Sequence, residues 1–267
     1  MKNLRIYGNK PYTVALLHGG PGYPGAMAPV ARELSADYGV LEPLQSVNTI
    51  IGQVAELAAV LLGHADIPVV LVGWSWGSTL ALLTASRHPD LVRKLILVCG
   101  APLETKYRVN TFSDALVRLN EEERKEIFHL DEIVNGDVAG DRAAAMARIF
   151  ALLTRANTYS LLPYRDEVLE YQVDINVSIA REAEELYAGR EFPQLLKKID
   201  CPVVAIHGDY DTHPLEGVKG PLSRALKDFR FILLEKCGHS PWYEKYARDK
   251  FFDILRKEIE YAFIENK

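Results

Sequence analysis

The feature that most restricts the fold of this chain is a regular alternation of strand-like and helix-like segments. Short apolar runs rich in valine, leucine and isoleucine recur, and most are followed by a segment with apolar residues at helical spacing. This alternation predicts an α/β fold, with a mostly parallel sheet and helices on both faces. The strand-like runs lie at residues 11–20, 38–44, 67–73, 93–100, 201–209 and 229–236.

The alternation stops in the middle of the chain. Between residues 103 and 192 the pattern is helical only, with no convincing strand. We interpret 103–192 as a helical cap inserted into one α/β core, which is formed by 1–102 and 193–267. A length of 267 residues suits a single large domain with such an insertion.

Composition excludes several classes of function. No apolar run approaches the roughly 20 residues of a membrane span, and the first residues do not resemble a secretory signal. Net charge is −5 with dispersed basic residues, which argues against a nucleic-acid or membrane partner. Three scattered cysteines (Cys99, Cys201 and Cys237) favour neither a disulfide framework nor a metal site. We expect a soluble cytoplasmic protein.

Ser75 stands in the motif G-W-S-W-G, residues 73–77, between a strand-like run and a helix-like one. G-x-S-x-G in this position predicts a sharp turn that exposes the serine at the top of the sheet. The helix that follows directs its N-terminal amide groups and dipole toward the serine, where they stabilise developing negative charge. Ser75 is therefore the candidate nucleophile.

A nucleophilic serine needs a base, and the base needs an orienting group. His239 follows the strand-like run 229–236 and precedes the last helix, so it should lie at the same sheet edge as Ser75. The stretch H-G-D-Y-D-T-H-P follows another strand and offers Asp209 and Asp211 as the acid. A buried carboxylate on the ring nitrogen remote from serine would fix the histidine tautomer.

These motifs resemble the α/β-hydrolase superfamily, and in particular its proline iminopeptidase-like branch. The resemblance rests on H-G-G-P-G at 18–22, on G-W-S-W-G-S at 73–78, and on the chain order serine, aspartate, histidine. In that family the acid stands three residues after the glycine of its strand-end motif. If Gly208 is that glycine, the resemblance implies that Asp211 rather than Asp209 is the acid, and that His239 is the base.

The H-G-G-P-G stretch also has a direct physical meaning. Two glycines before a proline let backbone N–H groups approach a substrate with no side chain in between. We expect the amides of Gly20 and Trp76 to form the oxyanion hole. Trp76 and Tyr23 are the expected substrate contacts, whereas His18 is expected to hold the loop.

The sequence thus predicts a serine hydrolase that cleaves a small ester or amide by acyl transfer to Ser75, without cofactor or metal. The substrate would be a small molecule or a short peptide, and an aminopeptidase of the proline iminopeptidase type is included. Fold and triad do not fix the bond attacked. A C–C bond hydrolase, a perhydrolase and a low-turnover ligand-binding protein therefore remain alternatives.

Recognition of a peptide amine would need carboxylates in the cap. Iminopeptidases of this kind hold the amine with a larger cap that carries tryptophan-glutamate motifs, whereas residues 103–192 contain no tryptophan. Six acidic residues there either bind an ammonium group or form solvated helix faces, since arginines are interleaved with them. They are Glu167, Glu170, Asp174, Glu182, Glu184 and Glu185.

Overall fold

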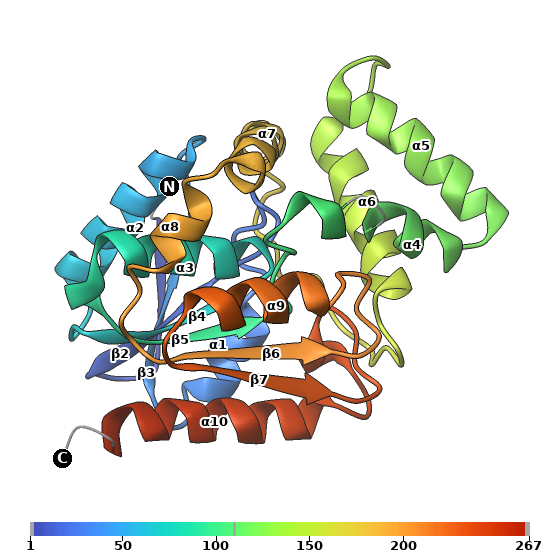
Figure 1. The fold of residues 1–267 in the computed structure, drawn as a ribbon. Coiled ribbons are helices and arrows are strands. Elements are labelled where there is room, and N and C mark those ends of the chain that lie inside the picture. The colour runs from blue at the N-terminus through green and yellow to red at the C-terminus, as the bar shows by residue number, and fades with distance from the viewer. Residues whose placement is uncertain (1–2, 109–110, 265–267) are drawn as a thin grey trace.

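A computed structural model describes residues 3–108 and 111–264. Its centre is a seven-stranded sheet with the order β1-β3-β2-β4-β5-β6-β7 (Figure 1). The strands are β1 (Leu4–Tyr7), β2 (Tyr12–Leu17), β3 (Gly39–Pro43), β4 (Val69–Trp74), β5 (Val92–Val98), β6 (Val203–Gly208) and β7 (Phe229–Leu234).

All neighbouring strands are parallel except β1, which pairs antiparallel with β3 at the sheet edge. The interior strands β4 and β6 are buried along their whole length, as expected when helices cover both faces. The expected α/β fold with a mostly parallel sheet is therefore confirmed. β1 is an addition: its four residues are mostly half-buried and too short to give a periodic signal.

Helices cover both faces of the sheet (Figure 1). One face packs α1 (Ala28–Leu34) and α10 (Arg248–Ile264) around a cluster that includes Met27 and Phe251. The other face carries α2 (Ile50–His64), α3 (Trp76–Arg87), α8 (Phe192–Leu196) and α9 (Glu216–Ala225). Three single turns of 3₁₀ helix complete the connections, at Pro89–Leu91, Thr105–Tyr107 and Pro241–Tyr243.

Between β5 and β6 the described residues form no named strand. Before α8, the helices in this stretch are α4 (Thr111–Val117), α5 (Glu121–Asn135), α6 (Arg142–Ala156) and α7 (Val173–Ala188). Helices α4 to α6 share a small apolar cluster and project from the sheet (Figure 1), whereas α7 packs on the core. The Tyr187 hydroxyl of α7 lies 2.7 Å from Thr79 Oγ1 of α3. The predicted cap segment thus contains two differently packed parts.

Within the described ranges, no helix has both the length and the apolar character that a membrane crossing requires.

Candidate active site

Ser75 occupies the turn between β4 and α3, with φ +53° and ψ −119°. A non-glycine residue in this region costs about 1–3 kcal/mol, so the surrounding packing must enforce it. A Cβ on Gly73 would lie 2.3 Å from the Gly77 carbonyl oxygen, and one on Gly77 would lie 2.3 Å from that of Leu17. The G-x-S-x-G spacing is therefore required by backbone approach on both sides of the serine.

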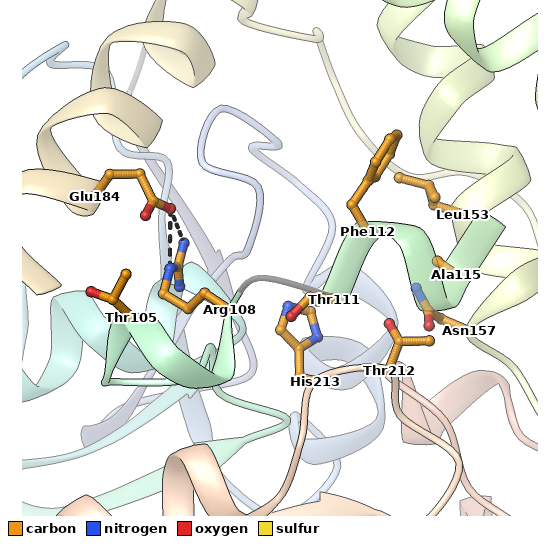
Figure 2. Close-up of a pocket in the computed structure, with 10 residues that line it drawn as sticks. All are labelled: Thr105, Arg108, Thr111, Phe112, Ala115, Leu153, Asn157, Glu184, Thr212 and His213. Carbon is orange, nitrogen blue, oxygen red and sulfur yellow. Dashed lines mark hydrogen bonds and ion pairs between the residues drawn. The ribbon is translucent and has the colours of Figure 1, made fainter. Parts of the chain in front are cut away.

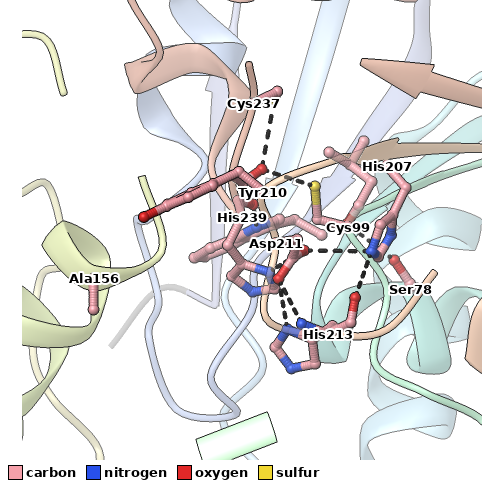
Figure 3. Close-up of polar contacts among 12 residues, drawn as sticks. Ser78, Cys99, Ala156, His207, Tyr210, Asp211, His213, Cys237 and His239 are labelled. Carbon is pink, nitrogen blue, oxygen red and sulfur yellow. Dashed lines mark hydrogen bonds and ion pairs between the residues drawn. The ribbon is translucent and has the colours of Figure 1, made fainter. Parts of the chain in front are cut away.

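The structure brings the predicted acid and base together. His239 Nδ1 lies 2.8 Å from Asp211 Oδ2, and the Asp211 side chain is fully buried (Figure 3). Burial alone would raise the pKa of Asp211, but its electrostatic interactions and hydrogen bonds with His239 and His213 hold it well below its usual value. Because an ionised carboxylate only accepts, Nδ1 of His239 donates, and Nε2 of the neutral ring is left as an acceptor.

Ser75, His239 and Gly20 line one pocket of about 180 Å³ at the carboxyl ends of the strands. A histidine with a free Nε2 acceptor and a serine hydroxyl, both lining one pocket, are the two groups that proton transfer from the serine requires.

Asp209 has a different environment. Its Oδ1 accepts from the backbone N–H of Cys237 at 3.1 Å, and its own N–H donates to the carbonyl of Leu234. It therefore joins the loop after β6 to the loop after β7, and neither bond involves His239.

Sequence reasoning missed His213, which is the second imidazole on Asp211. Its ring Nδ1 and its backbone N–H both lie 3.0 Å from Asp211 Oδ1, and its ring stacks on His239 with centroids 4.5 Å apart (Figure 3). Burial lowers the pKa of His213 more than Asp211 raises it, so the ring is neutral at pH 7. The sequence feature that could have identified His213 is its position two residues after Asp211.

The loop that carries His239 is fixed by residues distant in sequence. The backbone N–H of His239 donates to the Asn157 carbonyl at 2.8 Å, and Trp74 Nε1 donates to the His239 carbonyl at 2.8 Å. Glu244, which is fully buried, accepts from the N–H groups of Tyr159, Ser160 and Gly238. The end of α6 and the chain after it are thus tied to the histidine loop.

The H-G-G-P-G loop packs against α7. Gly22 has φ +84°, and a Cβ there would lie 2.7 Å from the Gln172 carbonyl oxygen. The N–H of Gln172 donates to the Gly22 carbonyl at 3.0 Å, and Asn176 Nδ2 donates to the Pro21 carbonyl at 2.7 Å. These bonds hold the adjacent Gly20 at the edge of the Ser75 pocket.

His18 is fully buried, and its Nδ1 lies 2.9 Å from the Gly19 carbonyl. Burial lowers the pKa of His18 to about 4, outweighing the bond to Gly19, so its ring is neutral at pH 7. A buried neutral ring with a local bond is what a loop-holding role requires.

The low pKa of His18 has a consequence for stability. Below about pH 6.5 the unfolded chain binds a proton at this ring that the folded chain does not, until pH falls to about 4. We expect this group to remove about 3 kcal/mol of unfolding free energy over that interval, at about 1.4 kcal/mol for each unit of pKa difference.

The test is chemical denaturation of the wild type and His18→Asn at several pH values from about 4 to 7.5. The asparagine Nδ2 can replace Nδ1 as donor to Gly19, and it does not titrate. Toward acid pH the unfolding free energy of the wild type should fall by about 3 kcal/mol relative to that of His18→Asn. Parallel curves would contradict a buried neutral His18.

The expected substrate contacts separate in the structure. Tyr23 lines the Ser75 pocket, with its ring 4.8 Å from that of Phe150 and 5.2 Å from that of Tyr171. The Trp76 side chain instead enters the core, where Nε1 donates to Gln53 Oε1 at 3.0 Å. Its backbone begins α3 beside Ser75, but Trp76 is not among the residues that wall the pocket, which differs from our expectation.

The six acidic residues of the predicted cap do not line the Ser75 pocket. Glu182 accepts from the N–H of Ile50, at the start of α2. Three others pair with arginines: Glu167 with Arg32, Asp174 with Arg142, and Glu184 with Arg108. Glu170 and Glu185 are exposed and line separate surface hollows.

Within the described residues, one group of possible metal ligands combines Cys99 with Asp211 and His239, with ligand atoms within 4.8 Å of one another. Burial raises the pKa of the Cys99 thiol well above its usual value, so it stays protonated. The two other members already bind each other. These residues therefore do not fit a metal ion.

Two solved structures share this architecture. One described as VinJ superposes with a TM-score of 0.67 at 19% identity, covering 97% of this chain and 94% of that one. The proline iminopeptidase of Mycobacterium smegmatis superposes with a TM-score of 0.62 at 17% identity, covering 99% and 96%. At these identities the likeness is one of fold alone, so it does not assign the chain to the iminopeptidase branch.

A curated relative, the pimeloyl-acyl-carrier protein methyl ester esterase of Neisseria meningitidis serogroup A, is 27% identical over 191 residues. The match covers 69% of this chain and 55% of that relative, so this chain spans about half of the relative's length. A model of the α/β hydrolase fold matches residues 45–246, a stretch that contains the serine turn, Asp211 and His239. Because that match covers most of the chain, this protein belongs to the α/β-hydrolase fold family.

Proposed function

We propose that this protein is an esterase that transfers the acyl group of a small carboxylic ester to Ser75 and then to water. The observation that carries the proposal is the single pocket where Ser75, His239 and Gly20 meet, with Asp211 buried behind His239. The curated relative from Neisseria meningitidis is named as a methyl ester esterase, which supports ester chemistry.

In this proposal Nε2 of His239 takes the proton of Ser75 Oγ while Oγ attacks the ester carbonyl. The N–H groups of Gly20 and Trp76 stabilise the tetrahedral oxyanion. His239 then gives its proton to the leaving alcohol. In the second half of the reaction, Nε2 of His239 takes a proton from water while the water oxygen attacks the acyl-serine. His239 then gives that proton to Ser75 Oγ, which releases the carboxylic acid and restores Ser75. Asp211 holds the tautomer and stabilises the imidazolium throughout.

The pocket dimensions favour a small ester group near the serine. A volume of about 180 Å³ is below the range of about 300–1,000 Å³ that drug-sized ligands occupy. Its walls include the apolar side chains of Phe150 and Leu153 and the ring of Tyr23. We therefore propose short acyl or small alkoxy groups at the reacting carbonyl.

The aminopeptidase reading receives no support from the pocket, because none of the six cap carboxylates lines it. We expect alanyl and prolyl arylamides to be poor substrates whose kcat/KM changes less than about threefold when the amine is acetylated. A desolvated charge contact would instead make acetylation cost on the order of 10²-fold or more.

The measurement compares each arylamide with its N-acetyl form, and both with 4-nitrophenyl butyrate. Glu184→Gln is the control, because Glu184 is the one of the six acidic cap residues that lines the chamber adjoining the Ser75 pocket. A large acetylation penalty that disappears in this variant would replace the esterase proposal by an aminopeptidase.

A further inference from the structure

A second, larger chamber adjoins the Ser75 pocket. It has a volume of about 440 Å³ and shares three lining residues with that pocket, namely Leu153, Asn157 and His213. We call it the outer chamber, and its remaining walls include Arg108, Glu184 and Thr212 (Figure 2). A substrate that reacts at Ser75 can therefore extend past His213 into this space.

The charges in the outer chamber cancel. Arg108 Nε lies 3.0 Å from Glu184 Oε1, and a second guanidinium nitrogen donates to the Pro102 carbonyl at 3.2 Å. The guanidinium also stacks over the Tyr187 ring at 4.3 Å, so it is held against its own wall. His213 adds no charge, because burial lowers its pKa. The chamber is built for an uncharged ligand.

Three buried side-chain atoms of the chamber have no hydrogen-bond partner among the described residues. They are Asn157 Oδ1, Thr212 Oγ1 and Thr111 Oγ1, and the first two belong to residues that are 9% and 4% exposed. Buried polar atoms are normally paired, and three exceptions in one cavity require an explanation. Figure 2 shows Asn157 and Thr212 on the side of His213 opposite to Arg108.

These atoms define the hydrogen-bonding character of the missing group. Asn157 Oδ1 accepts, and His213 Nε2 accepts because its Nδ1 donates to the Asp211 carboxylate. The Thr212 hydroxyl both donates and accepts. The complementary group is uncharged and carries an N–H donor beside a carbonyl acceptor. An alkyl chain would leave Asn157 Oδ1, His213 Nε2 and Thr212 Oγ1 without a hydrogen bond. An anion would have to displace Glu184 from Arg108.

We propose that the outer chamber binds a secondary amide group in the part of the substrate remote from the scissile ester. This inference rests on the proposed esterase function and adds a substrate class to it. The amide belongs either to the acyl chain or to the alcohol, and two series of esters distinguish these sources.

The acyl series compares 4-nitrophenyl 4-acetamidobutanoate and its homologues of shorter and longer spacer with 4-nitrophenyl alkanoates of equal chain length. The alcohol series compares 2-acetamidoethyl butyrate with pentyl butyrate. In one series we expect the amide ester to exceed its alkyl counterpart in kcat/KM by roughly tenfold, the scale of one or two hydrogen bonds. Thr212→Val should lower that preference by roughly fivefold.

Thr84→Val is the matched control, because the Thr84 hydroxyl is also buried but bonds to the Leu80 carbonyl within α3. It should leave the amide preference intact. Equal rates for amide and alkyl esters in both series would overturn the inference whether or not Thr212→Val folds, and so would a preference that Thr212→Val retains. If 4-nitrophenyl butyrate is cleaved in those cases, the esterase proposal survives; if no ester is cleaved, both fail.

Discussion

Ser75→Ala should lower kcat/KM for 4-nitrophenyl butyrate by on the order of 10⁵-fold, because the proposed acyl intermediate forms on the Ser75 hydroxyl. The residual rate would come from binding and from the proposed oxyanion donors alone, because the N–H groups of Gly20 and Trp76 belong to the backbone and do not depend on the serine side chain. The measurement is steady-state hydrolysis, combined with intact-mass analysis after treatment with a fluorophosphonate. The wild type should take up one equivalent of the reagent and Ser75→Ala none.

Ser240 provides the control for labelling, because it lines the same pocket and is the residue after His239. Ser240→Ala should still react at Ser75, which peptide mapping would identify. Stoichiometric labelling of Ser75→Ala would place the nucleophile elsewhere and overturn the proposed acyl transfer.

The turn at Ser75 was predictable because its requirements are local. Gly73 and Gly77 must lack side chains where the backbone of neighbouring strands and helices approaches, and that restriction is visible as G-x-S-x-G. The sheet was predictable for the same reason, since buried parallel strands appear as continuous apolar runs. β1 escaped because an edge strand of four residues carries no comparable run.

The surroundings of the site depend on contacts that no local pattern records. The Asn157 carbonyl fixes the His239 loop from a position far along the chain, and the Glu244 carboxylate joins this loop to the distant Tyr159 and Ser160, through bonds that a motif does not encode. The choice of Asp211 over Asp209 needed a family resemblance, because both follow the same strand. The Trp76 side chain turned toward Gln53 because the first turn of α3 faces α2 there, which the motif alone does not specify.

His213 shows how a site residue can be overlooked beside the residues that were weighed. It stands in the same H-G-D-Y-D-T-H-P stretch as Asp211, but a triad needs one histidine, and His239 already met that need. In the structure Asp211 uses one oxygen for each ring. The carboxylate therefore orients both the proposed base and a wall of the outer chamber.

Asp211→Asn should lower kcat by on the order of 10⁴-fold while leaving most of the substrate affinity. The asparagine amide can donate to Nδ1 of His239, which would leave Nε2 protonated and unable to accept the proton of Ser75. Asp209→Asn should cost less than about tenfold, because its Oδ1 can still accept from the N–H of Cys237. Steady-state kinetics on 4-nitrophenyl butyrate gives both values.

The two variants control for each other, since each removes one negative charge from the same loop after β6. Thermal unfolding of both proteins would show whether each variant is folded. A loss of kcat in a folded variant can then be assigned to the tautomer and orientation of the His239 ring. If Asp209→Asn were the more damaging change to kcat in a folded protein, the acid would be misassigned. The 2.8 Å contact between Asp211 and His239 argues for the opposite ranking, because orientation of the base acts through direct contact with its ring.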